Sequence, residues 1–175
     1  MSDTRRNALI WGAGALAAVA GAALGWRRWA PQAPVSGASA ELWASVFRSP
    51  EGVDMPMKQL AGRPLLLNFW ATWCPPCVEE MPMISNFFDA NRRGVNVLGL
   101  AIDQAPAVQR FLKQTPVTYP IAMAGAAGLG LAKSLGNQGG GLPYSVFFDR
   151  NGAQMYAKVG KLSESDLTDW LSKVA

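Results

Sequence analysis

The feature that most constrains this chain is a short apolar run that leads directly into two closely spaced cysteines. Residues 64–70 (Pro-Leu-Leu-Leu-Asn-Phe-Trp) form the run, and Cys74 and Cys77 follow it. A compact apolar run of this length is typical of a strand buried on both faces of a sheet. Pro75 and Pro76 suit the start of a helix, because the first helical N–H groups have no intrahelical partner. The segment therefore predicts a buried strand, a short loop and a helix that begins at the cysteines.

Cys74 and Cys77 are the only cysteines in the chain, and the chain has no histidine. A structural disulfide framework needs several crosslinks spread along the sequence. A structural zinc site needs four ligands, which one cysteine pair without histidine does not supply. We therefore expect no metal and no cofactor, and we interpret the pair as redox-active.

The predicted position of the cysteines suits thiol chemistry. The thiolate is the form that attacks disulfides, so a working cysteine needs stabilised negative charge. The unpaired N–H groups and the positive end of the dipole at a helix N-terminus provide that stabilisation. We expect Cys74 at this end and Cys77 one turn later, close enough to resolve a mixed disulfide and with its N–H available to the Cys74 sulfur. A C-x-x-C pair is a modest signal alone but a strong one between a buried strand and a helix.

The rest of the chain predicts an alternation of strands and helices. In order, we expect a hairpin within residues 42–57, a buried strand at 95–102, a helix from Pro106, a short strand at 119–123, a helix at 125–135, two strands at 144–149 and 154–159 joined by a turn, and a capped helix from Ser163. This pattern indicates an α/β domain.

The segment from Phe69 to Cys77 (Phe-Trp-Ala-Thr-Trp-Cys-Pro-Pro-Cys) resembles the active-site segment of the thioredoxin superfamily, specifically the TlpA/ResA type of membrane-anchored extracytoplasmic reductases. The likeness covers residues 41–175. It implies a thioredoxin-like fold, in which a central mixed β-sheet is flanked by helices and preceded by an N-terminal hairpin. It also implies a thiol-disulfide oxidoreductase in which Cys74 attacks and Cys77 resolves.

The resemblance also implies a cis proline that faces the cysteine pair, and Leu142-Pro143 stands in the matching place. An X-Pro bond that follows the three glycines 139–141 is in any case a plausible cis site; the alternative is an ordinary trans loop proline. We expect Leu142 and Pro143 to bind substrate together with Trp73, which would cover the site. The alternative for Trp73 is core packing.

Glu80 matches a family acid that assists deprotonation of the buried cysteine. Cys77 and Glu80 are three residues apart on the predicted helix and are therefore neighbours on one face. A partly buried carboxylate could have a raised pKa and exchange protons with Cys77. The alternative is a solvated surface glutamate like Glu79. Asn68 departs from the cytoplasmic thioredoxins, which carry a buried aspartate there, so Glu80 is the better candidate for proton handling.

Two further departures concern the substrate groove. The loop of residues 137–141 looks longer and richer in glycine than is usual in the family, and Tyr144 and Ser145 follow the proline where small, threonine-like residues are common. Both leave the shape of the groove open.

The N-terminus predicts a targeting segment. Residues 8–26 carry no charge and are flanked by Arg5-Arg6 and Arg27-Arg28. A helix of that length, at about 1.5 Å per residue, just crosses the hydrocarbon layer. We therefore expect a signal or anchor segment at 1–30, a linker at 31–40 and the thioredoxin-like domain at 41–175. An uncleaved anchor, a cleaved signal, and Sec or twin-arginine export all remain open.

Charge argues against a nucleic-acid partner. The formal net charge is +4, but four of the arginines lie in the first 28 residues against one acid, which leaves 12 basic and 11 acidic side chains elsewhere. The basic character therefore belongs to the targeting segment rather than to a polyanion-binding surface.

The leading functional hypothesis is a monomeric enzyme on the periplasmic face of the inner membrane that reduces disulfides of exported proteins. Apocytochrome c during haem attachment is one candidate substrate, and a membrane electron donor would re-reduce the enzyme. One alternative is a disulfide oxidant or isomerase. Such proteins often carry a histidine between the cysteines, where this chain has Pro75-Pro76. Another is a metal-delivery chaperone on the same fold, which would pair the cysteines with a distant histidine.

Overall fold

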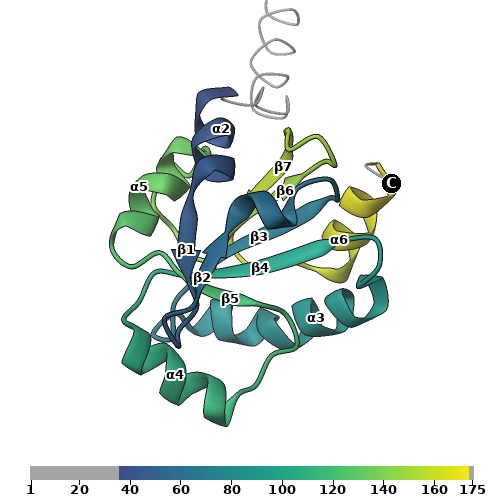
Figure 1. Cartoon of the computed structure of the whole chain (residues 1–175). Helices are drawn as coiled ribbons and strands as arrows, with labels where there is room; N and C mark the ends of the chain where they lie inside the picture. The colour runs from purple at the N-terminus through teal and green to yellow at the C-terminus, as the bar shows by residue number, and fades with distance from the viewer. Residues whose placement is uncertain (1–35, 174–175) are drawn as a thin grey trace, which may run out of the picture. The chain divides into compact units, whose positions relative to one another are not determined.

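The computed structural model describes residues 36–173, which form a seven-stranded mixed sheet with helices on both faces (Figure 1). In chain order the elements are α2 (Ser36–Ala44), β1 (Val46–Arg48), β2 (Asp54–Pro56), the 3₁₀ turn η1 (Met57–Leu60), β3 (Leu65–Trp70), α3 (Pro75–Asn91), β4 (Asn96–Ala101), α4 (Ala105–Gln114), β5 (Ile121–Met123), α5 (Ala127–Ser134), β6 (Tyr144–Phe148), β7 (Gln154–Val159) and α6 (Glu164–Ser172). The strand order across the sheet is β2-β1-β5-β4-β3-β6-β7. The α/β fold with a central mixed sheet is therefore confirmed.

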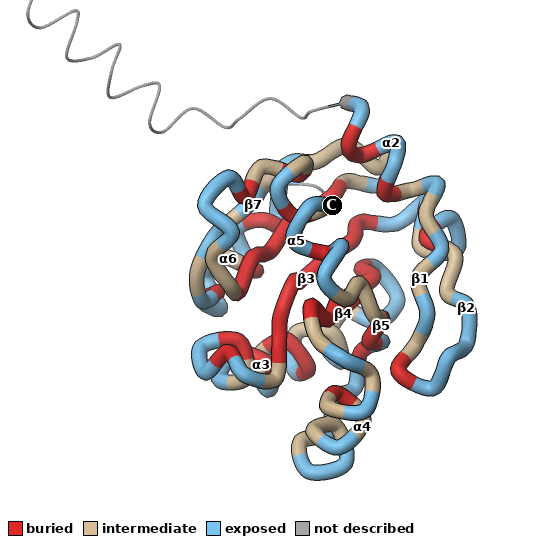
Figure 2. Tube along the Cα trace, turned by 90° about the vertical axis from the view of Figure 1, so that its left-hand side faces the viewer, coloured by how far each residue is buried: buried red, intermediate tan, exposed pale blue. Residues whose placement is uncertain are grey.

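Strand β3 lies in the middle of the sheet and carries the cysteine loop at its end. Every residue of β3 and of β4 is buried, which confirms both predicted buried strands (Figure 2). β3 pairs with β4 in parallel and with β6 in antiparallel register. Because β3 and β4 are parallel, the loops that follow them emerge at the same edge of the sheet.

The two faces of the sheet pack against different helices. Helices α3, α4 and α6 cover one face, where Leu66 and Trp70 of β3 meet side chains of those helices. Helices α2 and α5 cover the other face, where Leu65, Leu67 and Phe69 are buried. Successive residues of a strand point to opposite faces, so Asn68 belongs to the row of Leu66 and Trp70 beneath α3.

The N-terminal part of the domain differs from the expected linker. Residues 36–40, assigned to the linker at 31–40, form the first half of α2, and Ala38 and Leu42 of that helix are buried. Alanine is the strongest helix former, so an Ala/Ser-rich segment that can bury one side is stable as a helix. Trp43 anchors α2 through a 2.9 Å hydrogen bond from its Nε1 to the carbonyl oxygen of Gly152.

The predicted N-terminal hairpin is confirmed, since β1 and β2 pair in antiparallel register. The apolar run at 8–26 and the expected signal or anchor segment at 1–30 lie outside the described residues. Within residues 36–173, no helix has both the length and the apolar character that crossing a membrane requires.

Helix α6 begins with the predicted cap. The Ser163 hydroxyl accepts a hydrogen bond from the N–H of Asp166, and the Asp166 carboxylate accepts one from the N–H of Ser163. This capping box fixes the start of a helix that buries Leu167 and Trp170 against the sheet.

Replacing Ser163 with alanine is expected to lower the free energy of unfolding by about 1 kcal/mol, because the Asp166 N–H loses its acceptor. Urea denaturation followed by circular dichroism measures this change. Ser172→Ala is the control, because Ser172 lies at the other end of α6 and its hydroxyl caps no N–H group. Equal losses in the two variants would show that the cap contributes nothing specific.

Candidate active site

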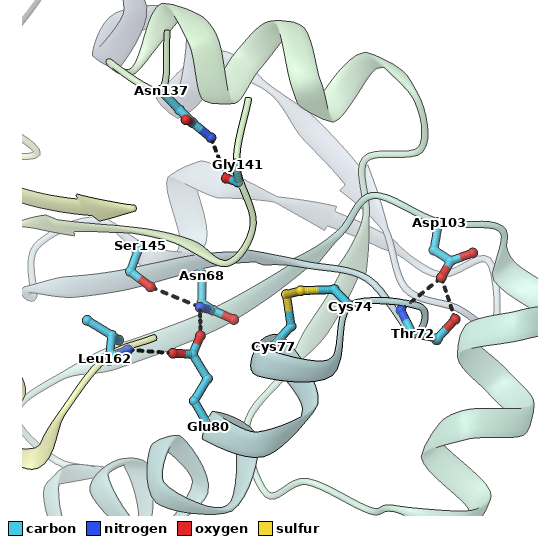
Figure 3. The surroundings of a disulfide bond; sticks show 10 residues. All are labelled: Asn68, Thr72, Cys74, Cys77, Glu80, Asp103, Asn137, Gly141, Ser145 and Leu162. Carbon is cyan, nitrogen blue, oxygen red and sulfur yellow. Dashed lines mark hydrogen bonds between the residues drawn. A yellow bond between two sulfur atoms is a disulfide. The ribbon is translucent and has the colours of Figure 1, made fainter. Parts of the chain in front are cut away.

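Cys74 and Cys77 lie at the N-terminal end of α3 and are joined by a disulfide (Figure 3). Cys74 is the N-cap residue, with Pro75 and Pro76 in the first turn, as the sequence predicted. Cys74 is 5% exposed, whereas Cys77 is completely buried. Of the two cysteines, only Cys74 therefore keeps any exposure to solvent.

The backbone N–H of Cys77 does not point where it was predicted to point. The N–H of Cys77 donates to the carbonyl oxygen of Cys74 at 3.1 Å, and the N–H of Val78 donates to the same oxygen at 3.2 Å. The Cys77 N–H is therefore engaged by the carbonyl in this disulfide form and is not directed at the Cys74 sulfur. The helix N-terminus still places its positive end at the cysteines.

Glu80 lies on the buried side of α3 and is completely buried, which excludes the alternative of a solvated surface glutamate. Its Oε1 accepts a 2.7 Å hydrogen bond from Nδ2 of Asn68, and its Oε2 accepts one of 2.7 Å from the N–H of Leu162. Burial raises the pKa of the Glu80 carboxyl above its usual value of 4.5, although these two hydrogen bonds and the charges of Lys161 and Lys158 oppose the rise. Glu79, its neighbour, faces solvent and pairs with Lys161 at 3.0 Å.

Asn68 connects Glu80 to the neighbouring strand β6. Its Nδ2 donates to Glu80 and also to the hydroxyl of Ser145 on β6, at 2.9 Å. Asn68, Glu80 and Ser145 are all completely buried. The contact with Ser145 was not predicted, although Ser145 was noted as unusual. A polar side chain on a buried strand beside a buried asparagine was the signal that could have indicated it.

A second polar cluster holds the loop before the cysteines. The Asp103 carboxylate, which follows β4, accepts hydrogen bonds from the N–H of Thr72 at 2.9 Å and from its hydroxyl at 2.6 Å. It also accepts a bond from the N–H of Gln104 at 2.7 Å. Partial burial acts to raise the pKa of Asp103, but these bonds outweigh it and lower the pKa. Asp103 was not predicted as a site residue, although an aspartate that follows a parallel strand beside the cysteine loop is a recognisable signal.

Asp103→Ala is expected to destabilise the protein by about 2 kcal/mol at neutral pH, because Thr72 and Gln104 lose a charged acceptor. Since the folded-state pKa is lowered, this stabilisation is present above the ordinary value of 3.8 and is lost as the pH falls through the folded-state pKa. Urea denaturation should therefore give a larger difference between the variant and the unmodified protein at pH 7 than at pH 3. Replacing the exposed Asp169 instead should give little difference at either pH.

The loop opposite the cysteines carries Pro143. The Leu142–Pro143 bond is cis, which confirms that prediction, and the Pro143 carbonyl oxygen accepts a 2.8 Å hydrogen bond from the N–H of Gly160. Leu142 packs on the core cluster that contains both cysteines. Trp73 is 66% exposed, which excludes core packing for this side chain.

The glycines before Pro143 differ in their freedom. Gly140 has a φ of +67°, a conformation that side chains rarely adopt. A Cβ at Gly141 would lie 3.0 Å from Cγ1 of Val159, whereas one at Gly139 would meet no atom within 4 Å. Tyr144 and Ser145 are both buried, so neither side chain offers a surface to a substrate.

The chain matches a known protein family over most of its length. The Redoxin family profile matches residues 46–171, which include the cysteine pair, Glu80 and Pro143. The chain belongs to the Redoxin family. The Redoxin chain is also similar to the thiol-disulfide oxidoreductase ResA of Bacillus cereus, with 32% identity over 127 residues that cover 71% of this chain and 70% of that protein. It is a thiol-disulfide oxidoreductase of the TlpA/ResA type within the thioredoxin superfamily.

Two solved structures of thioredoxin-related proteins are similar to this chain in fold and in sequence. The thioredoxin-related protein from Neisseria meningitidis serogroup B is 32% identical and has a TM-score of 0.66, covering 74% of this chain and 98% of that one. MTB dsbF, described in mixed oxidised and reduced forms, is 26% identical with a TM-score of 0.67, covering 79% and 98%. Protein thiols and disulfides are the substrates that membership of this family implies.

Proposed function

We propose that this Redoxin protein reduces disulfides in exported proteins by dithiol–disulfide exchange through Cys74 and Cys77. The observation that carries the proposal is the unequal burial of the two cysteines at the start of α3, with a buried carboxylate one turn further along the helix. One cysteine is accessible enough to attack, and the other is available only to the first.

The exchange proceeds in two balanced steps. The Cys74 thiolate attacks a substrate disulfide, forms a mixed disulfide and releases one substrate thiolate, which takes a proton from solvent. Cys77 then gives its proton to the Glu80 carboxylate, and the resulting thiolate attacks the Cys74 sulfur. The Cys74–Cys77 disulfide forms, and the second substrate sulfur leaves as a thiolate that takes a proton from solvent. The raised pKa of Glu80 supports its role as the acceptor of that proton.

The surface around Cys74 supports substrate binding by Trp73, Leu142 and Pro143. Trp73 precedes Cys74 in the chain and is exposed, and Leu142, next to the cis proline, packs on the core cluster that contains both cysteines. Apolar contacts of this kind suit an extended segment of a partly unfolded protein. Apocytochrome c before haem attachment is such a substrate.

The charge-free run at 8–26 supports a location on the extracytoplasmic face of the inner membrane, through an anchor or a signal. A membrane electron donor would then restore the dithiol, because no reductant pool is assured outside the cytoplasm.

Measuring the reduction potential against glutathione tests the direction of the reaction. The Pro75-Pro76 pair provides no polar group that would stabilise the thiolate further. We therefore expect a potential nearer that of thioredoxin, about −270 mV, than that of the oxidant DsbA, about −120 mV. The dithiol form should also reduce insulin. A potential near the DsbA value, with faster oxidation of a reduced protein than reduction of insulin, would instead identify a disulfide oxidant.

A further inference from the structure

The amide of Asn68 has one polar atom without a partner. Its Nδ2 has two acceptors, Glu80 and Ser145, but no donor among the described residues reaches its Oδ1, and this oxygen is buried. A buried acceptor without a hydrogen bond costs free energy, and each such atom in a folded protein calls for an explanation.

The orientation of the amide follows from its neighbours. An ionised Glu80 can only accept hydrogen bonds, so the nitrogen of Asn68 has to face it. The hydroxyl of Ser145 holds the same nitrogen from the other side. With its nitrogen fixed in this way, Asn68 presents its oxygen in the remaining direction.

That direction leads to the cysteines. Figure 3 shows the amide oxygen of Asn68 on the side of the side chain that faces Cys77. The placement agrees with the helix geometry, because Cys77 precedes Glu80 by three residues on α3 and Asn68 contacts Glu80 directly. Asn68 and Cys77 are both completely buried.

We propose that the oxygen of Asn68 accepts a hydrogen bond from the Cys77 S–H that forms when the disulfide is reduced. The inference rests on the dithiol–disulfide cycle proposed above. In the disulfide, the Cys77 sulfur carries no proton and Oδ1 stays unpaired. When a dithiol donor reduces the protein, the Cys74–Cys77 bond breaks, each sulfur takes a proton, and the donor becomes a disulfide. The new Cys77 S–H then satisfies Oδ1.

Asn68 would therefore stabilise the dithiol form relative to the disulfide, and the neutral Cys77 thiol relative to its thiolate. Glu80 acts in the opposite sense by removing the proton. The 2.7 Å hydrogen bond joins the Asn68 amide to the Glu80 carboxylate. Transfer of the proton to Glu80 therefore changes the charge of the group to which Asn68 donates. The same asparagine thus contacts both the donor and the acceptor of the proton.

The infrared S–H stretching band of Cys77 tests the bond directly. In the full chain with Cys74→Ser, Cys77 is the only thiol, and its band should lie below the frequency of a free S–H. Adding Asn68→Leu, which keeps a similar branched shape without the amide, should raise the band to the free frequency. Adding Ser145→Ala instead removes a partner of Nδ2 but keeps Oδ1, and should leave the band low. A band that Asn68→Leu does not move would overturn the proposal.

Nuclear magnetic resonance of the unmodified protein gives a second test that does not depend on a variant folding. On reduction with dithiothreitol, the Asn68 side-chain carbonyl resonance should move in the direction that accompanies a new hydrogen bond. The matched control is Asn96, the first residue of β4, which is also buried and whose Nδ2 donates to the carbonyl oxygen of Leu60. Equal shifts at the two asparagines, or none at Asn68, would contradict the proposal.

The equilibrium with glutathione supplies a third measure. Asn68→Leu removes both the unpaired acceptor in the disulfide and the bond in the dithiol, so the equilibrium constant for reduction should fall about tenfold. That change corresponds to about 30 mV towards more negative potential. An unchanged or increased constant would contradict the proposal. None of these tests requires turnover, so a loss of insulin reduction would count against the proposed function and not against this bond.

Discussion

Replacing Cys77 with serine is expected to turn the enzyme into a trap for its substrates. Cys74 would still attack a disulfide, but the mixed disulfide would lack its internal resolving thiol. Multiple-turnover reduction of insulin should fall on the order of 10²-fold or more, because a well-oriented intramolecular reaction is replaced by slow attack from solution thiols. Mass spectrometry of the acid-quenched protein should show one insulin chain attached to Cys74.

The matched control is Cys74→Ser, which removes the accessible sulfur and leaves the buried one. This variant should be equally inactive in turnover but should capture no insulin chain, since Cys77 is completely buried. Two variants that trap substrate equally well would show that the cysteines have interchangeable roles. The asymmetry inferred from their burial would then be wrong.

Replacing Glu80 with glutamine is expected to slow the second step of the exchange about 10²-fold at pH 7, because the amide cannot accept the Cys77 proton. The mixed disulfide should accumulate during turnover and should disappear faster as the pH rises, when Cys77 ionises without help. Rapid acid quenching followed by mass spectrometry measures the fraction of enzyme in that state. Glu79→Gln makes the same change of charge on a neighbouring residue whose side chain is 62% exposed, and it should leave the fraction unchanged.

The stability of the same pair of variants should depend on pH in a defined direction. The pKa of Glu80 is raised in the folded protein, so the folded state retains the proton at pH values where the unfolded chain has lost it. Stability associated with this group is therefore fully present below the ordinary value of 4.5 and is lost as the pH rises through the folded-state pKa. Relative to the unmodified protein, Glu80→Gln should gain stability across that interval, as measured by urea denaturation. A difference that does not vary with pH would contradict the raised pKa.

Most of the sheet could be predicted from the sequence, because its buried strands carry continuous apolar runs. The apolar runs at residues 64–70 and 95–102 favour strands that are covered on both faces, and they contain β3 and β4 in the structure. The segment before the hairpin was less predictable. The Ala/Ser-rich residues 36–40 suit a linker or a helix equally well by composition, and only the burial of Ala38 and Leu42 decides for the helix.

The candidate site was predictable where its residues are close in the sequence, and less predictable where they come from distant strands. Cys74, Cys77 and Glu80 lie within one stretch of helix, so their spacing alone placed them together. Ser145 and Asp103 reach the site from β6 and from the end of β4, and their contacts depend on strand register. No single window of sequence contains that register. The signals that Ser145 and Asp103 carry in the sequence mark them as unusual residues but do not name their partners, so their contacts with Asn68 and Thr72 are seen only in the fold.

The three glycines before Pro143 divide the loop into fixed and free positions, and this division bears on how the enzyme can diversify. Gly140 and Gly141 are restricted by backbone conformation and by Val159, whereas Gly139 has open space around its Cβ position. Residue 139 is therefore the position of the three where a side chain can be introduced without a clash or a strained backbone. A labelling group or a new side chain in this loop belongs at that position, because it leaves the backbone of Gly140 and the packing of Val159 untouched.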